Sequence, residues 1–265
     1  TGFSASAIAV PSVVSDAWEQ VGGGVSDVFY PEVFEGCWDV SSKLVSVDAK
    51  AGANGFDAKQ VQQTKEQELG RILGYSQCFI RNERGRVIAD RKRNTRELTE
   101  AIIGTQSDMQ IDWNPENPNV LKMKLPDGTN VFTRVTRRYS NQPSDDTLET
   151  SELFEQVFDY GIGNVPKVKA SRLITKWKWR QVPMRMESSD ADGDGTSESS
   201  STSTAEADKD SLGKSTQVQI IASQVLSNYA TPIDESNNDQ LSFANLSSPA
   251  SVFKYRMAFR SKLTE

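Results

Sequence analysis

Hydrophobic and polar residues alternate along much of the chain, with the two-residue period of a β-strand that buries one face. From position 253 to 259 every odd-numbered residue is aromatic or methionine, whereas Lys254 and Arg256 lie between them. The segment 172–180 follows the same pattern, with Trp177 and Trp179 on its apolar side. Each of these strands is therefore predicted to have one dry face and one solvated face.

Similar segments predict an antiparallel sheet of about eight to ten strands. The predicted strands are 34–47, 73–81, 86–91, 109–113, 120–125, 130–139, 152–160, 172–180, 216–226 and 253–260. A tight turn at Asp127-Gly128 joins two of them, because this dipeptide supplies the positive φ angles that a short hairpin needs. Helical signal is confined to two short polar segments, 57–68 and 95–103.

An all-β, up-and-down barrel is the predicted architecture, because a sheet that closes on itself covers its dry face and removes its exposed edges. A sandwich of two sheets is the alternative. The apolar runs fall well short of the ~20 residues that span a bilayer. We therefore expect no transmembrane segment.

The first predicted strand opens with Gly36-Cys37-Trp38. Gly-x-Trp at this place resembles the signature of the lipocalins, which are β-barrels of the calycin type. The resemblance implies that Gly36 lets the strand pass closely at the closed end of the barrel and that Trp38 plugs its floor. In the alternative interpretation Trp38 is an ordinary core aromatic, which also places it in the interior.

A longer series of motifs runs through the first part of the chain. The motifs are Tyr30-Pro31, Phe34-x-Gly36-x-Trp38, Cys78-Phe79-Ile80-Arg81, Val87-Ile88-Ala89-Asp90-Arg91 with Asn94, Asn117-Pro118-Asn119, Arg137-Arg138 and Thr150-Ser151-Glu152-Leu153-Phe154. In this order they resemble an uncharacterised family, a domain of unknown function, of cyanobacterial and plastid proteins, over residues 30–180. The resemblance implies a photosynthetic compartment and a lipocalin-like barrel, and it implies no chemistry.

The chain contains no histidine, which excludes Ser-His-Asp and Cys-His catalytic arrangements. The remaining residues form no recognisable nucleophile–base pair or metal-ligand cluster. We therefore expect a protein that is not an enzyme and that holds no cofactor or metal.

The net charge of −6 is unevenly distributed. Between positions 187 and 210, eight acidic residues accompany a single lysine, with many serines and no aromatic or branched aliphatic residue. Such a composition buries too little apolar surface to offset the entropy lost on ordering. Residues 187–212 are therefore predicted to form a disordered acidic insertion in a single barrel domain that spans residues 30–265.

The insertion contains Asp190-x-Asp192-x-Asp194-Gly195, which matches the first half of a calcium-binding loop. Ser201 stands at the twelfth position, where such a loop needs a bidentate glutamate. A solvated acidic tract is the preferred interpretation.

Positions 81 to 96 carry seven basic residues and two acidic ones. Arg84, Arg86, Lys92 and Arg93 are candidates to face a partner, either an acidic protein surface or anionic lipid. The alternative is an ordinary solvated face. Nucleic acid is disfavoured as a partner because the rest of the body is nearly neutral.

Asp90 and Arg91 end one of the predicted strands. A buried pair formed by these two residues, with Arg138 or Glu152 nearby, is expected to hold the barrel rim in place, because Arg–carboxylate contacts fix geometry.

Residues 1–29 show no strand or helix period and are predicted to form an extended N-terminal arm. Trp18, Phe29 and Tyr30 are its candidate apolar anchors on a partner, and Gly22-Gly23-Gly24 is a flexible break. The small apolar residues at its start resemble the end of a targeting segment.

Cys37 and Cys78 are the only cysteines. They would form a disulfide if their strands are neighbours and the compartment is oxidising, and otherwise they are free thiols.

Two functions remain. In the first, the protein is a non-catalytic accessory subunit that docks on a thylakoid membrane photosynthetic complex in the plastid, with a preference for the lumenal side. In the second, the barrel carries a lipid, a pigment or another small apolar molecule, as lipocalins do. A filled interior would favour the first function. The candidate filling residues are Trp38, Phe132, Trp177, Trp179, Phe253, Tyr255 and Phe259.

Overall fold

The computed structural model describes residues 25–49, 58–106, 108–183, 216–229 and 248–262. The acidic insertion, the calcium-like motif and Trp18 lie outside these ranges. The strands are β1 (Gly36–Ala49), β2 (Ile72–Arg81), β3 (Val87–Ala89), β4 (Gln110–Asn114), β5 (Asn117–Lys124), β6 (Asn130–Ser144), β7 (Thr147–Asp159), β8 (Lys167–Pro183), β9 (Thr216–Tyr229) and β10 (Ser251–Ser261). The helices are η1 (Glu32–Phe34), α2 (Ala58–Gln67) and α3 (Arg91–Ile103). Each predicted strand overlaps a strand of the structure, so the all-β prediction is confirmed.

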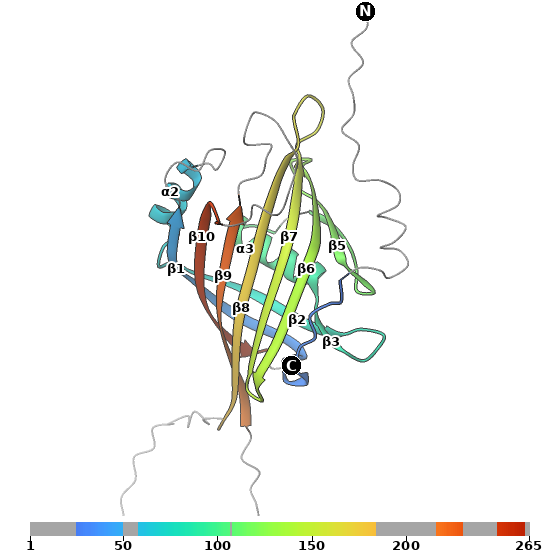
Figure 1. Ribbon diagram of the computed structural model, residues 1–265, viewed down its shortest axis with the longest axis vertical. Coiled ribbons are helices and arrows are strands. Elements are labelled where there is room, and N and C mark those ends of the chain that lie inside the picture. Colours follow the sequence, from blue (N-terminus) through green and yellow to red (C-terminus); the bar gives the residue numbers. More distant parts are fainter. Residues whose placement is uncertain (1–24, 50–57, 107, 184–215, 230–247, 263–265) are drawn as a thin grey trace, which may run out of the picture.

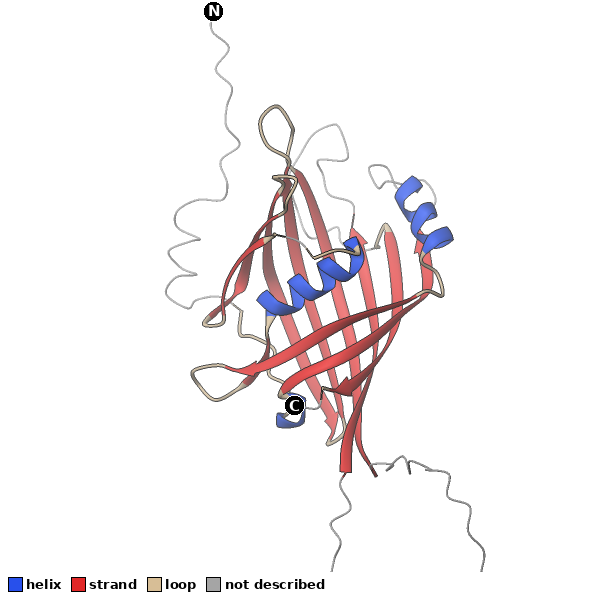
Figure 2. Ribbon diagram, turned by 180° about the vertical axis from the view of Figure 1, so that it is seen from behind, coloured by secondary structure: helices blue, strands red, loops and turns tan. Residues whose placement is uncertain are grey.

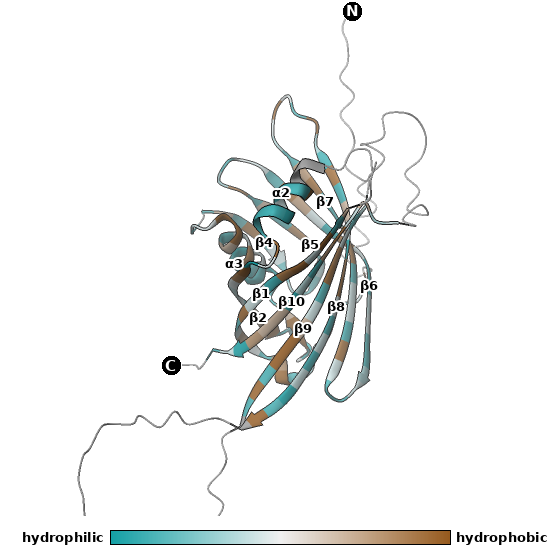
Figure 3. Cartoon of the chain, turned by 90° about the vertical axis from the view of Figure 1, so that its left-hand side faces the viewer, coloured by the Kyte–Doolittle hydropathy of each residue, from teal (hydrophilic) through white to brown (hydrophobic). Residues whose placement is uncertain are grey.

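The strands form one ten-stranded sheet in the order β3-β2-β1-β10-β9-β8-β7-β6-β5-β4, and each strand is antiparallel to its neighbour. The sheet curls into a half-barrel (Figure 1). Hydrophilic and hydrophobic residues alternate along its strands (Figure 3). The expected closure by hydrogen bonds is not complete: β1 pairs with β10, but β3 and β4 are the two edges of the sheet.

Helix α3 lies across the opening between these two edges (Figure 2), and it contacts β2, β4 and β5. The Asp90 carboxylate accepts a hydrogen bond from the Arg93 N–H at 2.9 Å and so caps the helix N-terminus. Gly104 ends the helix with a φ of +81°. The predicted strand 86–91 is therefore too long, because its last residues begin α3.

Aromatic residues fill the end of the half-barrel where β1 begins. Trp38 is buried, and its indole N–H donates to the Phe34 carbonyl at 2.8 Å. The Phe34 ring contacts the rings of Phe79, Trp177 and Trp179 at centroid distances of 5.3 to 5.5 Å. We call this group, together with Tyr30 and Phe259, the aromatic plug. It places Trp38 in the interior, as both interpretations of Gly-x-Trp predicted.

Two further clusters fill other parts of the interior. One joins Leu44, Val47 and Phe253 to Val61 of α2, and the other contains Met109, Ile111 and Leu121 beside α3. The expected filling by Phe132 is not found, because Phe132 follows the buried Val131 in the strand and its side chain points to the opposite face.

Cys37 and Cys78 face each other in the register of β1 and β2 and form a disulfide, with their Cα atoms 4.1 Å apart. The Asn94 side chain accepts from the Cys78 N–H at 2.7 Å and donates to the Cys78 carbonyl at 2.9 Å. The bridge that ties β1 to β2 therefore lies where α3 attaches to the sheet.

Residues 25–30 pack on the sheet instead of extending away from it. Val28 is 2% exposed, and the Tyr30 N–H donates to the Val87 carbonyl at 2.9 Å. The Tyr30 ring lies 4.7 Å from the Phe79 ring and 5.8 Å from the Trp177 ring. Tyr30, which was predicted to face a partner, is thus half-buried and packs against the core.

Two truncations measure what this short segment contributes. A chain lacking residues 1–28 is expected to be about 3 kcal/mol less stable than one lacking residues 1–24, because it loses the buried Val28 side chain and the Asp27 carboxylate. Urea denaturation of the two truncated chains gives the difference directly. Equal stabilities would show that residues 25–28 do not belong to the folded unit.

Candidate functional site

Four charged side chains meet inside the half-barrel, beside the start of α3. Arg138 of β6 and Glu152 of β7 are cross-strand partners, with Nε and Oε1 2.6 Å apart. Nη2 of Arg91 reaches Glu152 Oε1 at 2.7 Å and Asp27 Oδ1 at 2.8 Å. We call these four residues the charge cluster. It joins α3, the segment before η1 and strands β6 and β7.

The cluster is withdrawn from solvent and carries no net formal charge. The side chains of Arg138 and Asp27 are 2% and 5% exposed, and those of Arg91 and Glu152 are 17% and 16% exposed. Arg138 also donates to the Asn119 side chain and to the Pro118 carbonyl of β5. Buried ions are tolerated only when they are paired in this way, so each member depends on the others.

The two guanidinium groups control the ionisation of Glu152. Burial by itself raises the pKa of this carboxyl, but the neighbouring Arg91 and Arg138 outweigh burial and lower the pKa to about 2, from an ordinary value of 4.5. Burial raises the pKa of Tyr30, and the negative charge of Glu152 raises it further. Glu152 is therefore held as a carboxylate and is not poised to exchange a proton near neutral pH.

The structure brings together only part of the expected rim pair. Arg91 contacts Glu152, and Arg138 lies beside them as predicted, but Asp90 caps α3 and is not Arg91's ion-pair partner. The second carboxylate that pairs with Arg91 belongs to Asp27. The sequence did not indicate Asp27, because it lies in a segment without periodicity.

The other expected residues lie at the same end of the molecule, on the surface. Arg84 and Arg86 belong to the β2–β3 hairpin, Lys92 and Arg93 to the first turn of α3, and all four are exposed. The Arg86 guanidinium lies 4.3 Å above the Phe29 ring. We call these four residues the cationic surface.

The cationic surface keeps most of its charge unpaired within the described chain. Arg93 lies 3.8 Å from Glu97, a long and exposed contact. Arg81, by contrast, is neutralised by Glu35 at 2.8 Å and Glu32 at 3.5 Å. The end of the molecule that holds the aromatic plug therefore presents positive charge on rigid elements.

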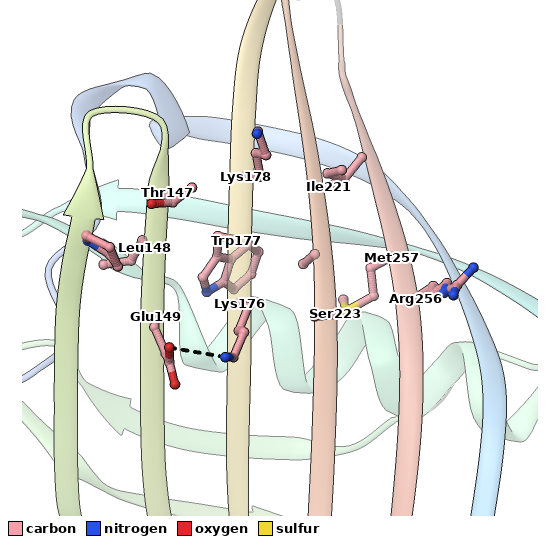
Figure 4. A pocket seen from close by; sticks show the side chains of 12 residues that line it. Thr147, Leu148, Glu149, Lys176, Trp177, Lys178, Ile221, Ser223, Arg256 and Met257 are labelled. Carbon is pink, nitrogen blue, oxygen red and sulfur yellow. Dashed lines mark ion pairs between the residues drawn. The ribbon is translucent and has the colours of Figure 1, made fainter.

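An open hollow of about 680 Å³ lies along β7, β8, β9 and β10 (Figure 4). Its apolar lining includes Leu148, Trp177 and Met257, and the exposed Glu149–Lys176 ion pair, at 3.5 Å, borders it. Among the described residues, no group of three or more Cys, Asp or Glu side chains is placed to hold a metal ion.

The chain matches the model of a family described as a domain of unknown function, DUF6816, over residues 22–262. It belongs to this family. No curated protein and no solved structure gives a significant match to it. In the described part of this DUF6816 chain, no helix is long and apolar enough to cross a membrane.

The charge cluster predicts a specific dependence of stability on pH. The pKa of Glu152 is lower in the folded chain than in the unfolded one, so its stabilising contribution is complete above about pH 5 and is lost as the pH falls toward 2. Glu152→Gln should lower the free energy of unfolding by about 3 kcal/mol at pH 7, because two buried guanidinium groups lose the carboxylate they share and keep only Asp27. It should also remove this part of the acid dependence, as measured by urea denaturation from pH 7 to pH 3.

Glu149→Gln is the matched control. Glu149 lies on the same strand and pairs with the exposed Lys176, so its loss should cost less than about 1 kcal/mol at every pH. Equal effects of the two substitutions would contradict the role assigned to the charge cluster.

Proposed function

We propose that the protein is a non-catalytic accessory subunit that docks on a thylakoid photosynthetic complex through the cationic surface. The supporting observation is that this surface stands on two elements held rigidly from beneath. The β2–β3 hairpin adjoins the disulfide and the aromatic plug, and α3 is anchored by the charge cluster. Fixed, unpaired cations favour an acidic partner, because their arrangement costs no further ordering on binding.

Side chains fill much of the interior of the half-barrel, which supports the docking function over the function of a ligand carrier. The aromatic plug occupies one end, and the other two apolar clusters pack against α2 and lie beside α3. Side chains that already contact one another leave less room for a cargo than an empty lipocalin barrel offers.

Two further observations fit the proposal. The charge cluster holds its carboxylates against guanidinium groups, which leaves Glu152 unsuited to act as a general base. The Cys37–Cys78 disulfide supports an oxidising compartment and so favours the lumenal side of the thylakoid.

Charge reversal tests the docking surface. The triple variant Arg84→Glu, Lys92→Glu and Arg93→Glu is to be expressed in a photosynthetic host that lacks its own copy. Native electrophoresis of gently solubilised thylakoids should find the wild-type protein with a photosystem-sized assembly. It should find at least about tenfold less of the triple variant there, because like charges oppose the acidic partner.

The control reverses the same number of exposed cations on the outer face of β1 and β10: Lys43→Glu, Arg256→Glu and Arg260→Glu. This variant should comigrate like the wild type. A wild-type protein that migrates as a free monomer with an extractable lipid or pigment would reject docking and favour the carrier.

A further inference from the structure

The loop between β7 and β8, residues 160–166, exposes apolar side chains at the end of the sheet away from the aromatic plug. Ile162 is fully exposed, Val165 is 70% exposed and Tyr160 is 45% exposed. The loop projects from the top of the sheet in Figure 1. Single exposed hydrophobic residues are ordinary, but three in one short projecting loop form a patch. We call these three residues the apolar tip.

The exposure of Ile162 is built into the loop. Gly161 and Gly163 flank it with φ values of +87° and +86°, a conformation that favours glycine. The Gly161 N–H donates to the Asp159 carboxylate at 3.0 Å, and the Asn164 N–H donates to the Gly161 carbonyl at 3.2 Å. A turn with these internal hydrogen bonds holds the isoleucine outward.

Cations stand directly behind the apolar tip. The Lys167 ammonium lies 5.8 Å from the centre of the Tyr160 ring, and the Lys169 ammonium lies 5.2 Å from the centre of the Phe158 ring. Both lysines are exposed. The acidic residue beside the loop, Asp159, already accepts the Gly161 hydrogen bond. The loop thus presents hydrocarbon at its tip and positive charge on long apolar stems at its base.

We propose that the apolar tip inserts into the interfacial region of an anionic lipid bilayer, with Lys167 and Lys169 at the level of the headgroups. Ile162 and Val165 gain from leaving water, and the lysines are attracted to the negative surface. Tyrosine is favoured at the boundary between headgroups and acyl chains. A convex tip with two lysines at its base fits a deformable surface, which needs no preformed groove.

The lipid contact is separate from the docking surface. Lys167 and the plug residue Trp177 are ten positions apart on β8, which spans roughly 33 Å in an extended strand. The cationic surface lies at the plug end, next to Phe79. Lipid binding does not rest on the proposed docking function, and vesicles free of protein test it alone.

Cosedimentation of the full chain with vesicles tests the apolar component. Wild-type protein should bind vesicles of phosphatidylcholine with phosphatidylglycerol more tightly than vesicles of phosphatidylcholine alone. The double variant Ile162→Asn and Val165→Asn should bind the anionic vesicles at least ~10-fold more weakly. Ile102→Asn is the control, since Ile102 is 67% exposed on α3 and should not matter.

Paired lysine variants test the electrostatic component. Lys167→Gln with Lys169→Gln should weaken binding to anionic vesicles by roughly fivefold per lysine and reduce its sensitivity to salt. Lys176→Gln with Lys178→Gln, farther along the same strand, should leave binding unchanged. Equal effects of the two pairs would overturn the assignment of the headgroup contact.

Labelling reports insertion itself. Both natural cysteines are engaged in the disulfide, so Val165→Cys provides a single free thiol for an environment-sensitive dye. Its emission should shift to the blue with anionic vesicles, whereas the dye on Ile102→Cys should not respond. Absence of wild-type vesicle binding, equal binding to both lipid compositions, or an unresponsive Val165→Cys label overturns the proposal. If the wild-type protein binds no vesicles, a protein is favoured over lipid as the partner of the apolar tip.

Discussion

The charge cluster is the interaction on which closure of the half-barrel depends. The backbone hydrogen bonds of the sheet stop at β3 and β4, and α3 with residues 25–30 bridges the opening instead. Arg91 connects α3 to Glu152 of β7, which also pairs with Arg138 of β6, and it binds Asp27 within the bridge. Because a buried ion without its partner is costly, the loss of one of these contacts is expected to loosen the bridge. Lys92 and Arg93, the part of the cationic surface on α3, are held in place by this arrangement.

Sequence periodicity predicted the strands because a sheet that buries one face has apolar side chains at every second position of each strand. Trp177 and Phe259 lie inside for this reason, and Lys178 and Arg260 lie outside. Short connections account for the antiparallel pairing of β2 with β3 and of the strands from β4 to β8. The position of the opening was not predictable in the same way, since β3 is only three residues long and nothing in its sequence identifies it as an edge.

The closing elements were predicted only in part: the helical signal over 95–103 covers most of α3 (Arg91–Ile103), but its first turn and residues 25–30 were assigned otherwise. No residue of α3 is fully buried, so the helix has no strong apolar face to produce a helical period. Asp27 and Tyr30 lie in an irregular segment, and the contacts that tie them to the sheet and to α3 are distant in sequence. An aromatic residue next to an apparent arm was therefore assigned to a partner, although it packs against Phe79 and Trp177. Long-range ion pairs leave no local pattern to detect.

The two ends of the molecule differ in chemistry. The plug end carries fixed cations above a neutral buried cluster, and the far end carries the apolar tip with lysines behind it. A stiff curled sheet separates them, so each surface can contact its own partner without disturbing the other. Such a body suits a protein that positions a membrane assembly, in line with the proposed function.

Hydrogen exchange of the α3 amides tests the closure most directly. Arg91→Gln removes the link from α3 to Glu152 and Asp27 but leaves the Arg138–Glu152 pair in place. The amides from Thr95 to Gly104 should then lose protection together, while those of β8 and β9 keep theirs. Arg93→Gln, two residues farther along the same helix and exposed, should change the protection of neither group. Unaltered protection of α3 in Arg91→Gln would contradict closure by the charge cluster.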